Sequence, residues 1–145
     1  SNPDKYIKEF VDAGADTLII HTEASNDIER DLLDIKKMGV KCGLAIKPNT
    51  NENVLLDFLD ILDYVLVMSV EPGFGGQSFI EGTLDKMRSI VAMREDRDIL
   101  IGVDGGVNMK TIRSVYEAGV DITIVGSGLY KASNIEERYE SLLSV

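Results

Sequence analysis

The chain has 145 residues, of which 44% are hydrophobic and 28% charged, and its net charge is −10. This length and composition predict one globular domain over residues 1–145 with a core of its own. The acidic balance and the lack of a Lys/Arg cluster argue against nucleic acid as a partner. No apolar run is long enough to cross a membrane, so no membrane partner is expected either.

Apolar periodicity predicts a chain in which helices and strands alternate. The first elements expected are a helix capped by Asn2 and ended by Gly14, a strand over 17–21, a helix capped by Asn26, a strand over 40–46 and a helix capped by Thr50 or Asn51. Next come a strand from Val65, a helix over 82–94, a strand over 99–103, a helix capped by Asn108, a strand over 122–125 and a helix capped by Asn134. The pattern therefore contains five strands and six helices.

An internal repeat supports this alternation. Residues 10–20 resemble residues 115–125, and in both a helix ends at glycine and an aspartate leads into an apolar strand. Strands that are apolar almost throughout indicate a parallel sheet with both faces covered. A doubly wound sheet and part of a (βα)₈ barrel both fit. The barrel is favoured because no G-x-G-x-x-G motif follows the first strand and because reactive residues follow several strands.

Glycine-rich loops follow the last three strands. Such a loop turns sharply and can direct backbone N–H groups at an anion, although each loop taken alone could be a tight turn. Together they predict a phosphate site, which barrels favour near their last strands. The loop residues are Gly73, Gly75 and Gly76 after the third strand, Gly105 and Gly106 after the fourth, and Gly126, Ser127 and Gly128 after the fifth.

Two side chains at predicted strand ends could carry chemistry. His21, the only histidine, ends the first strand and is a candidate metal ligand or general acid/base; the alternative is a histidine satisfied at the rim of the core. Asp104 follows the fourth strand and is a candidate acid/base and metal ligand; the alternative is a helix cap. Asn108 is better placed as that cap, which favours function for Asp104.

The cysteine content indicates a compartment. Cys42 is the only cysteine, so no internal disulfide is possible, as is typical of a reducing environment. No secretory signal peptide is recognisable in the sequence. We therefore expect a cytoplasmic location.

The run over residues 67–79, Val-Met-Ser-Val-Glu-Pro-Gly-Phe-Gly-Gly-Gln-Ser-Phe, closely resembles the signature of ribulose-phosphate 3-epimerases. Residues 20–24 resemble the H-x-E stretch of that family, and residues 103–107 and 125–127 resemble its last two strand ends. The matches occur in order over the whole chain. The central motif is highly specific, and the others add weight jointly.

This resemblance implies a (βα)₈ barrel that interconverts D-ribulose 5-phosphate and D-xylulose 5-phosphate in the pentose phosphate pathway. It also implies a divalent metal ion, Zn²⁺ or Fe²⁺ with Mn²⁺ or Co²⁺ as further options. His21 and Asp104 match metal ligands that also contact substrate, and Asp104 matches one of two acid/base carboxylates. The matched phosphate positions are Gly73, Phe74, Gly75, Gly76, Gly105, Gly106, Gly126 and Ser127.

The chain also departs from the family. It resembles the portion that begins just after the third strand, so an incomplete barrel is expected, inactive by itself. Five strands cannot close a barrel, and apolar edges at 17–20 and 122–125 lead us to expect a homo-oligomer. Lys47 stands where relatives often have Asn. Two alternatives remain, an allulose-6-phosphate 3-epimerase and a non-catalytic half-barrel that binds phosphorylated ligands.

Overall fold

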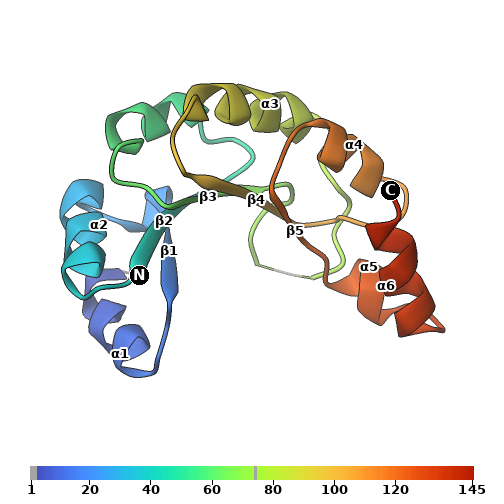
Figure 1. Cartoon of the computed structure of the whole chain (residues 1–145), viewed down its shortest axis with the longest axis horizontal. Helices are drawn as coiled ribbons and strands as arrows, with labels where there is room; N and C mark the ends of the chain where they lie inside the picture. The colour runs from blue at the N-terminus through green and yellow to red at the C-terminus, as the bar shows by residue number, and fades with distance from the viewer. Residues whose placement is uncertain (1–2, 74) are drawn as a thin grey trace.

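The computed structural model describes residues 3–73 and 75–145 (Figure 1). Its strands are β1 (Thr17–His21), β2 (Lys41–Ile46), β3 (Tyr64–Met68), β4 (Leu100–Asp104) and β5 (Ile122–Ile124). Its α-helices are α1 (Ile7–Asp12), α2 (Ile28–Lys37), α3 (Thr83–Arg94), α4 (Ile112–Glu117), α5 (Ser127–Tyr130) and α6 (Ile135–Leu143). Short 3₁₀ helices are η1 (Pro3–Lys5), η2 (Thr22–Ala24) and η3 (Glu52–Phe58).

The five strands form one parallel sheet in the order β1-β2-β3-β4-β5. A doubly wound sheet reverses its strand order near the middle, whereas a barrel adds each new strand beside the last. The sheet curves and stays open, and the helices lie along its outer side (Figure 1). This is the fold predicted from the sequence, an incomplete (βα)₈-type barrel with parallel strands.

The core lies between the inner strands and the helices. The residues of β2, β3 and β4 are all buried except Lys41, Leu66, Leu100 and Asp104, and the apolar faces of α2 and α3 are buried with them. The edge strands differ, since Ile122 and Ile124 of β5 are 36% and 40% exposed. The expectation that both faces of every strand are covered is therefore correct for the inner strands and wrong for the edges. An inner strand has neighbours on both sides, and an edge strand lacks one.

Several predicted helix starts are wrong by a few residues. Asp27, not Asn26, caps α2, because its carboxylate accepts from the Arg30 N–H at 3.1 Å. Asn108 accepts from the Lys110 N–H in the preceding loop, and α4 begins only at Ile112. A capping side chain belongs to the residue directly before the helix, from which it reaches the N–H groups two or three residues on. Asn26 and Asn108 stand too early in the chain for the first turns of α2 and α4.

Two further differences are a predicted helix of another type and a helix that was not predicted. The helix expected after Asn51 is the 3₁₀ helix η3, although Asn51 does accept from the Asn53 N–H at 2.9 Å. The sequence pattern did not indicate α5, since four residues are too few to show a helical period. Asn134 caps α6 as predicted.

No helix in the described ranges combines the length and apolarity that crossing a membrane requires.

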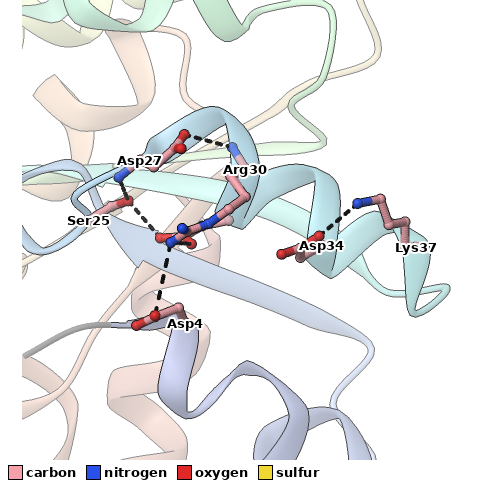
Figure 2. Close-up of polar contacts among 7 residues, drawn as sticks. Asp4, Ser25, Asp27, Arg30, Asp34 and Lys37 are labelled. Atoms are coloured by element: carbon pink, nitrogen blue, oxygen red, sulfur yellow. Dashed lines mark hydrogen bonds and ion pairs between the residues drawn. The ribbon is translucent and has the colours of Figure 1, made fainter.

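A buried carboxylate holds the loop between β1 and α2 (Figure 2). Asp31 on α2 is 1% exposed and accepts a hydrogen bond from the Ser25 hydroxyl at 2.6 Å. Arg30 approaches Asp31 at 3.3 Å and Asp4 at 3.9 Å, which links η1 to the same place. A buried carboxylate needs such partners. The loop that follows His21 is therefore fixed at its far end.

Candidate active site

A cavity of about 260 Å³ lies where the loops after β3, β4 and β5 meet. The carboxyl ends of parallel strands share one edge of the sheet, so loops distant in sequence converge there. Asp104 and all but one of the predicted phosphate residues line this cavity; the exception, Phe74, lies outside the described residues. The predicted residues that line it are Gly73, Gly75, Gly76, Asp104, Gly105, Gly106, Gly126 and Ser127.

The backbone after β4 can take its path only with glycine. Gly105 and Gly106 have φ values of +120° and +65°, which L-residues rarely adopt. A Cβ on Gly106 would lie 2.5 Å from the backbone nitrogen of Phe79, so the two loops are in close contact. Ser69 fastens them further, since its hydroxyl donates to the Gly105 carbonyl at 2.5 Å and its N–H to the Asp104 carbonyl at 2.8 Å.

No lysine or arginine is among the described residues that line the cavity. Its charged groups are the carboxylates of Asp104 and Glu71. An anion there would rely on backbone N–H groups, as the glycine loops predict. Lys131, which was not predicted from the sequence, is a basic neighbour of this cavity. Its Nζ lies 3.4 Å from where a Cβ on Gly76 would stand. The available signal was its position four residues after Ser127, one helical turn away.

His21 lines a second, more open hollow of about 300 Å³, with Glu23, Ala24, Lys47 and Pro72. Pro72 also lines the glycine-loop cavity, so the two hollows adjoin. The structure therefore places Asp104 among the glycine loops and His21 beside them, in separate hollows. Lys47 is a half-buried member of the His21 hollow.

Side-chain contacts, rather than glycines, organise the His21 hollow. Glu23 accepts from the Lys47 N–H at 3.1 Å and from the Thr50 hydroxyl. Burial raises the pKa of Glu23, but these hydrogen bonds outweigh it and lower the pKa to about 2. The ionised Glu23 lies beside His21, whose Nδ1 is 3.4 Å from Glu23 Oε2. This part of the site thus carries a fixed negative charge.

The described residues contain no group of three or more His, Cys, Asp or Glu side chains placed to hold a metal ion. His21 and Asp104 offer an imidazole and a carboxylate, ligand types that suit Zn²⁺ and Fe²⁺. They line different hollows, however, and two ligands rarely hold Zn²⁺ against water. By themselves they do not form a metal site.

The chain is similar to proteins of known family. The profile of the ribulose-phosphate 3 epimerase family matches residues 1–130. The ribulose-phosphate 3-epimerase of Aquifex aeolicus is 42% identical over 99% of this chain and 66% of its own length. That of Bacillus subtilis is 44% identical over 91% of this chain and 62% of its own length. The chain thus spans just under two thirds of the length of the relatives that it matches.

Solved structures resemble the fold at low sequence identity. A 3-hexulose-6-phosphate synthase from Salmonella typhimurium has a TM-score of 0.71 at 19% identity, over 97% of this chain and 65% of its own. A mutant tryptophan synthase α-subunit from Pyrococcus furiosus has a TM-score of 0.73 at 18% identity, over 97% and 60%. At such identities the likeness supports the fold alone.

Proposed function

Because the chain belongs to the ribulose-phosphate 3-epimerase family, we propose that this protein interconverts D-ribulose 5-phosphate and D-xylulose 5-phosphate by inverting carbon 3, a step of the pentose phosphate pathway. The observation that carries the proposal is the cavity in which three glycine loops surround the acidic side chain of Asp104. A phosphate recognised at the loops would hold the sugar so that its reactive carbon faces a carboxylate.

The glycine loops serve binding. Gly73, Gly75 and Gly76 line the cavity together with residues of the loops after β4 and β5. Their backbone N–H groups would receive the phosphate oxygens, with Phe74 contributing from the same loop by its resemblance to the family. Phosphate binding by a neutral cradle suits a chain of net charge −10, because a local dipole field replaces long-range attraction.

Asp104 serves proton transfer. A proton next to a ketone can be removed by a positioned carboxylate, which leaves an enediolate. Return of a proton to the opposite face, from a second carboxylate, inverts the centre. Asp104 is half-buried at the end of β4, and its backbone carbonyl accepts hydrogen bonds from the hydroxyl and the N–H of Ser69, which hold the backbone at this strand end. The second carboxylate is not among the residues assigned here.

The family is consistent with a divalent metal ion. A bound divalent ion, Zn²⁺ or Fe²⁺ or alternatively Mn²⁺ or Co²⁺, would supply Lewis-acid stabilisation of negative charge that develops on the substrate. By the resemblance to the family, His21 and Asp104 would supply two of its ligands, and the remaining ligands would come from elsewhere. Isothermal titration of residues 1–145 with Zn²⁺ should accordingly show only weak binding.

The decisive experiment is epimerisation in D₂O, followed by NMR. Protein expressed from its complete reading frame should convert D-ribulose 5-phosphate to D-xylulose 5-phosphate and introduce deuterium at carbon 3, whereas residues 1–145 alone should not. Allulose 6-phosphate is assayed in parallel, and faster turnover of that sugar would replace the proposed substrate. No exchange with either sugar, in the presence of each of the four metals, would leave only phosphate binding and refute the enzyme.

We also propose that the protein is a homo-oligomer, because β1 and β5 leave apolar edges open. The cytoplasmic location remains the proposal made from its single cysteine. Light scattering during size-exclusion chromatography should give a mass above the 15.9 kDa of a single chain. A stable monomer that unfolds cooperatively at that mass would contradict the assembly.

A further inference from the structure

Lys47 combines a fixed backbone with a side chain that has no partner. Its N–H donates to Glu23 Oε1 at 3.1 Å, and its carbonyl accepts from Lys86 Nζ at 3.1 Å. The residue is half-buried, yet its ammonium group makes no hydrogen bond or ion pair within the described part of the chain. Two side chains from other elements therefore hold in place a residue whose own charge is unpaired.

The loop that begins at this lysine is fastened on two further sides. Lys86 of α3 also donates to the carbonyls of Pro48 at 2.5 Å and Thr50 at 2.6 Å. An ammonium group has three protons to donate, and three carbonyls of this loop receive them. Asn49 donates to Glu71 Oε1 at 3.1 Å, which joins the loop after β2 to the loop after β3. The loop is therefore positioned relative to the glycine-loop cavity, which Glu71 lines.

The strand register places Lys47 in one row with Asp104. Met68 pairs with Asp104, and Asp104 pairs with Ile124. The pairing of β2 with β3 runs up to the residues that precede Lys47 and Met68, so these two are neighbours in the continued register. Pro48 disfavours a helical backbone at the residue before it, so the alternation of side chains along β2 continues through that residue. Across four strands, the row consists of Lys47, Met68, Asp104 and Ile124.

This row lies on the face of the sheet that carries the candidate site. Met68, Asp104 and Ile124 line the glycine-loop cavity, and Lys47 lines the hollow that adjoins it. Neighbouring strands lie about 4.8 Å apart, so the backbones of Lys47 and Asp104 stand about 10 Å apart on the same face. A lysine side chain carries its charge on a flexible four-carbon stem. The ammonium group can therefore reach a molecule bound at Asp104.

The two ends of the row differ in chemistry. Ile124 is followed by Gly126 and Ser127, part of the glycine loops to which we assign the phosphate, and Lys47 stands at the opposite end. In a five-carbon ketose phosphate, carbon 3 lies between the phosphate and the oxygens of carbons 1 and 2. With the phosphate at the loops and carbon 3 at Asp104, those oxygens would face Lys47. An ammonium group only donates, which suits carbonyl and hydroxyl oxygens.

We propose that Lys47 is a further substrate-binding residue, whose ammonium group donates hydrogen bonds to the oxygens of carbons 1 and 2 of the ketose phosphate. The inference rests on the proposed function and adds a residue for the end of the sugar away from the phosphate. Glu23 and Lys86 contribute indirectly, because they hold the backbone of Lys47. A lysine that only attracted anions would not distinguish the sugar from inorganic phosphate.

The test compares two ligands that share a phosphate group. D-Ribitol 5-phosphate keeps the hydroxyl groups of the sugar but has no ketone, so it cannot be epimerised and its binding is independent of turnover. Isothermal titration of the protein expressed from its complete reading frame measures this ligand and inorganic phosphate separately. Lys47→Met, which keeps an apolar stem and removes the charge, should weaken binding of D-ribitol 5-phosphate about tenfold. Phosphate binding should hardly change at about 0.15 M salt, where the Debye length is about 8 Å.

Matched variants separate substrate contact from loop structure. Lys47→Arg should retain most of the affinity for D-ribitol 5-phosphate, because a guanidinium group also donates. Lys86→Met should lower that affinity less than Lys47→Met does, since it only loosens the backbone of Lys47. Lys37→Met, which loses only an exposed pair with Asp34 (Figure 2), should leave both ligands unchanged. In turnover, Lys47→Met should raise KM for D-ribulose 5-phosphate more than it lowers kcat.

Two results would overturn the proposal. Unchanged binding of D-ribitol 5-phosphate to Lys47→Met would mean that the lysine does not touch the sugar, and equal weakening of both ligands would mean that it serves the phosphate. Neither result bears on the epimerase, which deuterium exchange at carbon 3 decides. Conversely, a wild-type protein without exchange, whose Lys47→Met variant loses affinity for D-ribitol 5-phosphate alone, would refute the epimerase and keep the binding residue.

Discussion

The two halves of the candidate site differ in whether backbone or side chains give them their shape. The half after β3, β4 and β5 is made mainly of glycine backbone, and its shape depends on φ values and on loops in close contact. The half after β1 and β2 is made of side chains, Glu23, Thr50 and Lys86, that fasten loops to one another. A backbone cradle resists substitution at its own positions, whereas a side-chain network can be loosened from a distance.

The largest effect should come from Asp104→Asn, which removes the one side chain assigned a proton-transfer role in the backbone half. Loss of a general base typically lowers turnover by about 10²- to 10⁴-fold. The rate of carbon-3 exchange by protein expressed from the complete reading frame measures it, with Asp85→Asn as the control because Asp85 is a surface partner of Arg88. Near-normal turnover of Asp104→Asn would exclude the assigned role.

Gly106→Ala should break the backbone half. The new Cβ would meet the backbone of Phe79 at a φ of +65°, so we expect a loss of about 3 kcal/mol in the free energy of unfolding. Gly75→Ala is the matched control in the same cavity, because nothing lies within 4 Å of its Cβ and its φ is not positive. Urea denaturation compares the two, and equal stabilities would show that the cradle tolerates side chains.

Lys86→Met should loosen the side-chain half. It removes the ammonium donor shared by three loop carbonyls, of which, among the described residues, only that of Lys47 keeps another partner, the Thr50 N–H, and we expect a loss of about 1–3 kcal/mol in the free energy of unfolding. The exposed Lys37→Met should change stability by less than about 0.5 kcal/mol. Hydrogen exchange of the loop over 47–50 should accelerate in the first variant only. Unchanged exchange there would mean that the loop is held by other contacts.

Cys42, near the start of β2, makes the stability of the protein depend on pH. Burial and the nearby Asp63 raise the pKa of the thiol to about 11 from 9.0. The folded state then keeps a proton that the unfolded state loses, so stability is unaffected below pH 9 and declines between pH 9 and 11. At pH 10 we expect a loss of about 1 kcal/mol relative to Cys42→Ala, measured as the difference between their urea curves. Parallel pH profiles would contradict the raised pKa.

Lys131→Met should have the smallest effect. If backbone N–H groups hold the anion, the lysine beside Gly76 adds only a screened contribution, and inorganic phosphate should bind about threefold more weakly. High salt should abolish the difference between variant and wild type. A loss of more than about tenfold that persists in salt would show that the lysine, not the backbone, anchors phosphate.

Local sequence patterns determined much of this protein. Apolar runs located all five strands within one or two residues, and glycine after the last three marked the cavity, because these signals depend on neighbours in the chain. The fold class followed from the alternation of these runs with helical patterns, and the family from the resemblance of residues 67–79 to its signature. Helix starts were less predictable, since Asp27 and Asn26 are equally good caps and only the backbone path selects one.

Contacts between distant segments were decided by the tertiary structure alone. Lys86 is 36 residues from Thr50, and nothing in its sequence neighbourhood indicates that its three protons bind one loop. The structure likewise separated His21 from the cavity of Asp104 and gave Glu23 its two sets of partners. Strand register and sheet curvature set these distances, and both depend on packing over the whole sheet rather than on any local pattern.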